Sequence, residues 1–247
     1  MPHYDAIVIG AGQAGNPLSQ KLADHGWSVA LVEKEHLGGT CVNTGCTPTK
    51  TMMATGRRPN TDDLGLQEAG VQTDQRGFIR VNNRLETSVP GVWALGDVKG
   101  GPAFTHISFN DYQIVYANLI DGSALTSDNR PVPYAVFTDP QLGRVGLTES
   151  EARADGRRLK VGKISMAWVA RAIERDETAG LMKLVVDAET DRILGAAILG
   201  SEGGEVVQIL HAVMLAGAPY TLLKGAVYIH PTLAEGLWTL MEAVTAV

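Results

Sequence analysis

The sequence has little of several features that mark whole classes of protein. Only two of its 247 residues are cysteines, too few for a disulfide-stapled secreted scaffold and too few alone for a four-thiolate zinc site. No apolar run reaches the ~20 residues that a membrane helix needs. The net charge is −6 and no lysine or arginine run occurs, so we expect neither nucleic acid nor membrane as a partner. Without a charged leader and cleavage site, the expected location is the cytoplasm.

The chain opens with the pattern of a parallel strand, helix and strand. Apolar residues fill 6–9, helical spacing follows over 14–25, and a second apolar run covers 29–32. Further on, 92–95 predicts a short strand and 109–119 a helix. This part, residues 1–125, predicts an α/β Rossmann-like domain.

The rest of the chain, residues 126–247, mixes strand and helix patterns. Strands are predicted over 145–147, 181–187 and 193–199, and helices over 149–155, 204–216 and 233–243. This alternation predicts an α+β domain.

Three glycines lie between the first strand and the first helix. Gly10 permits a tight turn, Gly12 lets the backbone approach a pyrophosphate, and Gly15 lets helix and strand pack closely. Glu33 ends the second strand, where its carboxylate can accept hydrogen bonds from a ribose diol. The pattern predicts a dinucleotide site but does not distinguish FAD from NAD, and a plain glycine-rich turn is the alternative.

The two cysteines, Cys41 and Cys46, are five residues apart. In a regular helix this spacing means a rise of ~7.5 Å, whereas bridged Cα atoms lie within ~7 Å of each other. A bridge therefore needs an irregular segment, which Gly45 and Pro48 favour. A helix start and the cation of Lys50 would lower the pKa of a thiol there.

Two other interpretations of the cysteines remain open. They are a pair of buried structural thiols, or half of a metal site completed by histidines such as His36. The Cys-x4-Cys spacing is not the tight hairpin that zinc sites favour, so we expect no metal.

Taken together, the motifs resemble those of the class I pyridine nucleotide-disulfide oxidoreductases, such as dihydrolipoamide dehydrogenase, glutathione reductase and mercuric reductase. The matching segments, in family order, are the glycine turn with Glu33, residues 39–50, 55–60, 94–97 and 230–235. The resemblance implies a truncated FAD-binding domain followed by an α+β dimerisation domain, and it implies that the dinucleotide is FAD.

The resemblance also implies roles for individual residues. Cys46 would lie against the flavin, Cys41 would exchange with a disulfide substrate, and Lys50 would lie beside the flavin. His230, held by Glu235, would be the acid and base for the exchanging thiol, reaching it from the partner subunit; histidine titrates near neutral pH. The residues implied in cofactor binding are Gly10, Gly12, Gly15, Glu33, Lys34, Gly39, Thr40, Gly96, Asp97, Thr105 and His106.

One interval departs from the family pattern. Only residues 51–56 separate Lys50 from Arg57, where the relatives hold the rest of the FAD domain and the NAD(P)H domain. We therefore expect no NAD(P)H site, and we interpret the glycines of 200–204 as packing residues. The function predicted is FAD-dependent thiol–disulfide oxidoreduction.

The alternative function is a non-catalytic flavin-binding and dimerisation remnant. An NAD-dependent dehydrogenase would leave the cysteine pair unexplained. The substrate would be a small thiol or disulfide; the family's mercuric reductases carry a second cysteine pair near the C-terminus, which 239–247 lacks. A homodimer is expected from the apolar helix 206–215 and from the borrowed His230.

Overall fold

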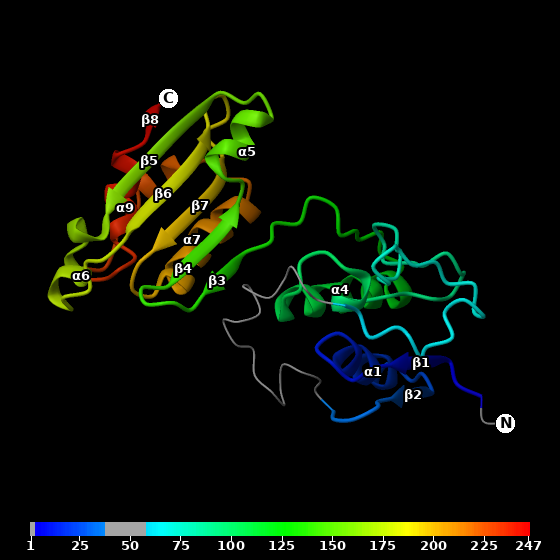
Figure 1. Ribbon diagram of the computed structural model, residues 1–247. Helices are drawn as coiled ribbons and strands as arrows, with labels where there is room; N and C mark the ends of the chain where they lie inside the picture. Colours follow the sequence, from blue (N-terminus) through cyan, green and yellow to red (C-terminus); the bar gives the residue numbers. More distant parts are fainter. Residues whose placement is uncertain (1–2, 38–57) are drawn as a thin grey trace. The chain divides into compact units, whose positions relative to one another are not determined.

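The computed structural model describes residues 3–37 and 58–247 and divides the chain into two units (Figure 1). The first unit runs from Met1 to Arg130 and the second from Pro131 to Val247. The division falls in the loop that separates the last helix of the first unit from the first strand of the second.

The first unit begins with a parallel pair of strands joined by a helix. Strands β1 (Ala6–Ile9) and β2 (Val29–Val32) pair in register from Ala6 with Val29 to Ile9 with Val32. Helix α1 (Gly15–Asp24) crosses between them, so the predicted strand, helix and strand are confirmed. The 3-10 turn η1 (Gly96–Lys99) and helix α4 (Thr105–Ile120) follow later in the chain.

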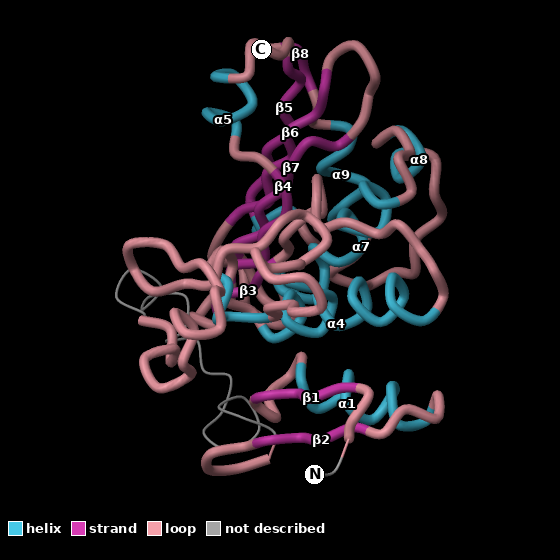
Figure 2. The backbone as a smooth tube through the Cα atoms, turned by 90° about the vertical axis from the view of Figure 1, so that its right-hand side faces the viewer, coloured by secondary structure: helices cyan, strands magenta, loops and turns pink. Residues whose placement is uncertain are grey.

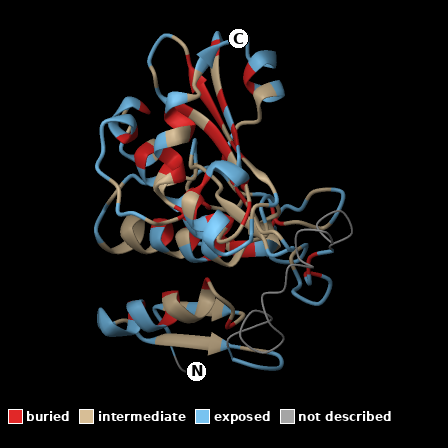
Figure 3. Cartoon of the chain, turned by 90° about the vertical axis from the view of Figure 1, so that its left-hand side faces the viewer, coloured by how far each residue is buried: buried red, intermediate tan, exposed pale blue. Residues whose placement is uncertain are grey.

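The larger hydrophobic cluster described in this unit lies between α1 and α4, and a smaller one holds Val71, Ile79 and Ala94. Leu18 and Leu22 of α1 pack with Ile114 and Val115 of α4 and with Leu85. On the face of β1 that points away from α1, Ile7 is 63% exposed and Ile9 66% exposed among the described residues. In Figure 3, β1 and β2 accordingly carry intermediate and exposed colours.

Two predictions for this unit need correction. The strand predicted over 92–95 is wrong, because Trp93 makes only an isolated bridge to Glu86 before the chain turns into η1. The helix predicted from 109 begins at Thr105, four residues earlier. Gly100 and Gly101, both with positive φ, form the turn that precedes the helix. The helix begins soon after this turn, which is why it starts before the apolar spacing indicates.

The second unit is built on an antiparallel sheet in the order β3-β4-β7-β6-β5-β8. Its strands are β3 (Tyr134–Val136), β4 (Leu142–Gly146), β5 (Leu159–Ser165), β6 (Leu181–Asp187), β7 (Ile193–Leu199) and β8 (Thr245–Ala246). Its helical segments are α5 (Glu149–Ala154), η2 (Met166–Trp168), α6 (Ala170–Glu174), α7 (Gly203–Leu215), α8 (Thr221–Lys224) and α9 (Gly236–Glu242).

Helices cover both faces of this sheet unequally. Figure 2, in which the sheet is close to edge-on, places α7, α8 and α9 on one side. Successive side chains of β6 point to opposite faces of the sheet. Leu184 and Val186 lie in the core beneath α7 and α9, whereas Val185 packs against Ala152 of α5 on the other face.

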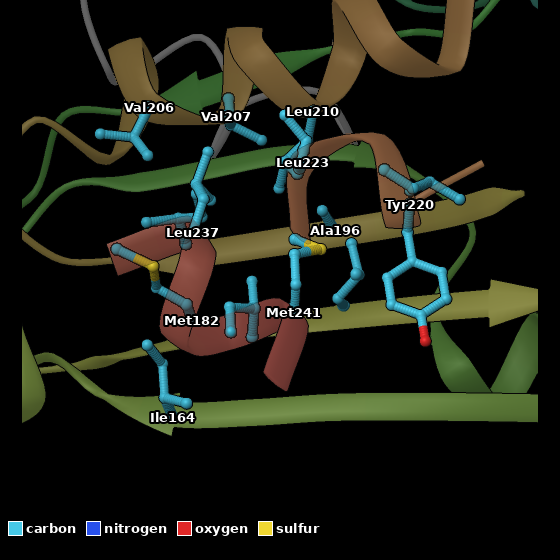
Figure 4. Close-up of a cluster of buried hydrophobic side chains, with 14 of the residues drawn as sticks. Ile164, Met182, Ala196, Val206, Val207, Leu210, Tyr220, Leu223, Leu237 and Met241 are labelled. Carbon is cyan, nitrogen blue, oxygen red and sulfur yellow. The ribbon is translucent and has the colours of Figure 1, made fainter. Parts of the chain in front are cut away.

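The main core of the second unit lies between α7, α9 and the sheet (Figure 4). Val207 and Leu210 of α7, Leu237 of α9 and Ile198 of β7 are at most 1% exposed. Most apolar side chains of the helix predicted over 206–215 are therefore buried in the core of the second unit. This helix does not supply the free apolar surface on which the homodimer prediction partly depended.

The glycines after β7 act in packing, as the sequence predicted. A methyl carbon added at Gly203 would lie 2.6 Å from the carbonyl oxygen of Ile198, and one at Gly143 would lie 2.1 Å from that of Gly203. Such distances require glycine, because a Cβ would collide with backbone. The segment thus joins strand and helix closely.

Candidate functional site

The glycine turn has the close packing that its spacing predicts. Gly10 adopts φ +95° and donates its N–H to the carbonyl of Val32 at 2.7 Å. A methyl carbon added at Gly15 would lie only 2.0 Å from the carbonyl oxygen of Gly10. At Gly12, in contrast, no described atom lies within 4 Å of an added Cβ. The turn is therefore closed against α1 and open at Gly12, where a bulky ligand group could approach the backbone.

Glu33 closes this turn from the second strand. Its Oε2 accepts the N–H of Ala11 at 2.7 Å and its Oε1 accepts that of Glu35 at 3.0 Å. These backbone donors, first that of Ala11, lower the pKa of the Glu33 carboxyl despite some opposing burial. The carboxylate is thus held ionised next to the open part of the turn, and Lys34 beside it is exposed.

A second turn, Gly96–Lys99, lies close to the first although about 80 residues separate them in the sequence. A Cβ added at Gly96 would lie 3.9 Å from that of Ala14 and 3.0 Å from the hydroxyl of Ser108. Gly96 has φ +73°, which glycine adopts without strain. Asp97 is exposed at the first turn of η1.

Thr105 and His106 begin α4, shortly after this turn. The His106 ring stacks on that of Phe104, with centroids 5.2 Å apart. Of the predicted cofactor residues, those described lie at the glycine turn, at the end of β2, in η1 and at the start of α4. Gly39, Thr40, Cys41, Cys46 and Lys50 lie outside the described residues.

A buried charge cluster that the sequence did not predict contacts the second turn. Asp111 of α4 is fully buried and forms ion pairs with Lys99 at 3.2 Å and with Arg130 at 2.8 Å. Its Oδ2 also accepts the N–H of Gly96 at 2.8 Å. The available signal was a single carboxylate among the apolar residues of α4, three residues after the small Ser108.

The second unit brings His230 and Glu235 together. The Nδ1 of His230 lies 2.8 Å from Oε2 of Glu235, and the His230 side chain is 71% exposed whereas that of Glu235 is 18% exposed. Thr232 supports Glu235, because its hydroxyl accepts the Glu235 N–H at 3.1 Å and donates to the carbonyl of Ile229 at 2.8 Å. This arrangement fixes the ring through Nδ1 and presents the Nε2 edge for proton transfer.

A shallow cleft of ≈390 Å³ adjoins this pair. Gly236 allows its walls to meet, because an added Cβ would lie 2.8 Å from a methyl group of Val169. Burial raises the pKa of the Tyr228 hydroxyl, which donates to the carbonyl of Leu223. The residues that line the cleft are Trp168, Val169, Ala170, Ala226, Tyr228, His230, Glu235, Gly236, Trp238 and Thr239.

The described residues hold neither a candidate metal site nor a candidate membrane span. Within 3–37 and 58–247, no group of three or more histidine, cysteine, aspartate or glutamate side chains is placed to hold a metal ion. In the same part of the chain, no helix has the length and apolar character needed to cross a membrane.

Two family models match the chain. The model described as pyridine nucleotide-disulphide oxidoreductase matches residues 4–54 and 50–111. The model of the dimerisation domain of the same family matches residues 132–241. Together they span most of both units.

Curated relatives agree with the family models. The probable pyridine nucleotide-disulfide oxidoreductase RclA of Escherichia coli is 41% identical over 194 residues, covering 78% of this chain and 44% of the relative. The dihydrolipoyl dehydrogenase of Thermus scotoductus is 42% identical over 195 residues, covering 79% of this chain and 42% of the relative. The chain thus spans less than half the length of these two relatives.

Solved structures support the same assignment. The HOCl-induced flavoprotein disulfide reductase RclA of Escherichia coli superposes with a TM-score of 0.73 at 30% identity, covering 96% of this chain and 58% of that one. Its Cu(II) complex gives a TM-score of 0.90 at 24% identity over 98% of this chain and 99% of that chain, a likeness of fold. The chain belongs to the class I pyridine nucleotide-disulfide oxidoreductases, with a Rossmann-like FAD-domain region followed by a dimerisation domain.

Proposed function

We propose that this protein is an FAD-dependent thiol–disulfide oxidoreductase in which Cys41 and Cys46 form the redox pair and His230 is their acid and base. The observation that carries this proposal is the exposed His230 ring held through Nδ1 by Glu235 at 2.8 Å. A ring oriented in this way can take a thiol proton at Nε2 and return it to a leaving thiolate.

An external dithiol first reduces the Cys41–Cys46 bridge to two thiols and is itself oxidised to a disulfide, and His230 takes the proton of the Cys41 thiol. The thiolate of Cys41 attacks one sulfur of the substrate disulfide, the S–S bond breaks, and the leaving thiolate takes a proton from His230. The thiol of Cys46 then passes its proton to the neutral His230 and attacks the Cys41 sulfur of the mixed disulfide. The second thiolate leaves and takes that proton from His230 as the Cys41–Cys46 bridge closes. Two electrons have passed from the cysteine pair to the substrate, and Glu235 stabilises the charged ring between the two proton transfers.

The described residues of the first unit fit FAD. The open backbone at Gly12 suits a pyrophosphate, the ionised Glu33 suits a ribose diol, and the exposed Asp97 suits ribityl hydroxyls. When bound, FAD would supply the two-electron couple that reduces or oxidises the cysteine pair. We assign Lys50, Thr105 and His106 to the flavin ring, and Lys34, Gly39 and Thr40 to the remainder of the cofactor site.

The proposed active protein is a homodimer, because the family's arrangement brings the histidine to the cysteines of the partner subunit. The match of residues 132–241 to a dimerisation domain supports it. Sedimentation at micromolar concentration should give a dimer, and a strict monomer would remove His230 from the mechanism.

We also propose that the substrate carries uncharged substituents on its disulfide. The residues that line the cleft beside His230 include no lysine or arginine, and the nearby Arg171 pairs with Glu174 at 3.0 Å. Trp168 and Trp238 are 66% and 49% exposed and offer flat apolar surfaces. Exchange with the uncharged 2-hydroxyethyl disulfide, whose leaving thiol is no more acidic than glutathione, should therefore be faster than exchange with the charged glutathione disulfide.

Anaerobic titration of the FAD-loaded protein with dithiothreitol tests the redox function. Reduction should produce the long-wavelength absorption band of a thiolate that lies against a flavin. Cys46→Ser should abolish this band, whereas Cys41→Ser should retain it because Cys46 keeps its thiolate. An unchanged band in Cys46→Ser, or no band in the unaltered protein, would contradict the proposal.

A second candidate is a flavin-binding and dimerisation module without turnover. The observation that favours it is that the chain spans only 44% and 42% of the two curated relatives. On this candidate FAD binds and dithiothreitol produces no band. For both candidates we propose that NADH and NADPH reduce the flavin very slowly, since orientation of the nicotinamide supplies much of the rate in such transfers.

A further inference from the structure

Asp111 is the most deeply buried polar side chain among the described residues. It has 0% exposure, whereas the other buried polar residues in the described chain retain 7–9%. A buried carboxylate is costly unless hydrogen bonds and opposite charges compensate for lost water. Asp111 has both kinds of compensation, and the partners that provide them identify what the residue does.

The partners of Asp111 hold both ends of one turn. Its Oδ2 accepts the backbone N–H of Gly96 at 2.8 Å and lies 3.2 Å from Nζ of Lys99. These are the first and last residues of η1. Oδ1 accepts a hydrogen bond from Nη1 of Arg130 at 2.8 Å, from outside the turn. One carboxylate thus anchors the whole Gly96–Lys99 segment to α4.

The backbone of the turn is held on the same side by close packing. A Cβ at Gly96 would lie 3.0 Å from the hydroxyl of Ser108, which is one helical turn before Asp111. Asp97 lies between the two anchored residues and is exposed. The backbone on both sides of Asp97 is therefore held in place by the contacts of Asp111, and this limits where the Asp97 carboxylate can lie.

We propose that Asp111 is a positioning residue of the flavin site, which holds the Gly96–Lys99 turn so that Asp97 meets the ribityl hydroxyls. The inference rests on the proposed function, in which Asp97 binds FAD. Lys99 and Arg130 both neutralise the buried carboxylate, but only Lys99 belongs to the turn. Loss of Lys99 should therefore disturb the turn and FAD binding, whereas loss of Arg130 should affect mainly the stability of the fold.

Lys99→Gln and Arg130→Gln make a matched pair, since each removes one cation from the same carboxylate. On stability alone Arg130→Gln should be at least as damaging, because its ion pair is the shorter at 2.8 Å against 3.2 Å. If Asp111 positions the turn, FAD affinity should instead fall more in Lys99→Gln than in Arg130→Gln. We expect Lys99→Gln to raise the Kd for FAD about 10-fold and Arg130→Gln less than about 3-fold, as for loss of one hydrogen bond to a charged group.

A double-mutant cycle gives a second measurement. Asp111→Asn should weaken FAD binding roughly 10- to 100-fold. If Asp111 acts through Asp97, the double variant Asp97→Ala/Asp111→Asn should bind FAD within about 3-fold of Asp97→Ala alone, because coupled residues are not additive. Kd is measured by calorimetric titration with FAD, and the thermal unfolding of each apoprotein is recorded beside it.

The outcomes separate this inference from the function on which it rests. Additive losses in the cycle, or an Arg130→Gln variant that weakens FAD as much as Lys99→Gln, would overturn the positioning role while FAD binding stood. If Asp111→Asn does not fold, the Lys99 and Arg130 pair decides alone. An unaltered protein that takes up no FAD would remove the proposed function and this inference together.

Discussion

The two units of this protein differ in how completely they bury their sheets. The second unit covers an antiparallel sheet with helices and has Leu184, Ile198, Leu210 and Leu237 at 0% exposure. In the described part of the first unit the sheet is a single parallel pair of strands, with Ile7 and Ile9 more than 60% exposed. Parallel strands are normally covered on both faces, and isolated two-stranded sheets are marginal. The second unit therefore has the more complete core of its own, whereas the first depends on α1, α4 and the proposed cofactor.

The largest expected effect is a leucine truncation compared between the cores. Leu237→Ala should cost near the upper end, and Leu22→Ala near the lower end, of the ~2–5 kcal/mol range for buried leucines. Leu22 has partly exposed neighbours such as Trp27 that can relax toward it, whereas Leu237 is enclosed. Calorimetry should resolve the two units, with Leu215→Ala, at a residue that is 63% exposed, as the control. Equal losses would show that the first core is as well packed as the second.

The next effect should follow the addition of FAD. At a free concentration of 100 times Kd, a ligand that binds only the folded state stabilises it by about 2.7 kcal/mol. We expect this shift in the unfolding transition of the first unit alone, since its glycine turn and Gly96–Lys99 turn form the proposed site. If both transitions move together, the two units unfold cooperatively and the contrast between them fails.

Substitutions at two glycines of the first unit should affect folding and FAD binding separately. Gly15→Ala should destabilise the apoprotein by ~1–3 kcal/mol, because its methyl group would collide with the carbonyl of Gly10. Gly12→Ala meets no described atom, so the apoprotein should unfold at an unchanged temperature while FAD affinity falls. Unfolding curves with and without FAD provide the measurement. Retained FAD affinity in Gly12→Ala would remove the pyrophosphate from this turn.

Strands β6 and β7 of the second unit could be predicted from the sequence because each is a continuous and mainly apolar run. The apolar runs of 181–187 and 193–199 predict β6 and β7 with the observed bounds. Strand β5 was missed, since Lys160, Gly162 and Lys163 interrupt its apolar residues. Its place comes from pairing with β6 along its whole length, which is a tertiary contact. The strand predicted over 92–95 fails for the opposite reason, since an apolar run there finds no partner strand.

The candidate site divides in the same way. His230 and Glu235 are five residues apart, so a local motif could predict that they meet, and Nδ1 of His230 lies 2.8 Å from Oε2 of Glu235. Asp111 meets Gly96 and Arg130 across 15 and 19 residues, and no local pattern encodes those contacts. A residue such as Asp111, which contacts the turn that carries a ligand-binding residue, can be recognised only from the folded structure.

The smallest expected effect concerns the charge of Glu33. Its folded-state pKa is lowered, chiefly by the N–H of Ala11, so the stabilisation is present above the unfolded-state pKa and is lost as pH falls through the lower folded value. Glu33→Gln keeps an acceptor but no charge, and the loss at pH 7 should be within about 0.5 kcal/mol, as for exposed positions. The difference between Glu33→Gln and the unaltered protein should shrink below the unperturbed value of 4.5. Thermal unfolding of the first unit between pH 7 and pH 3 measures it, and a difference that grows on acidification would mean that the Ala11 contact is not made in solution.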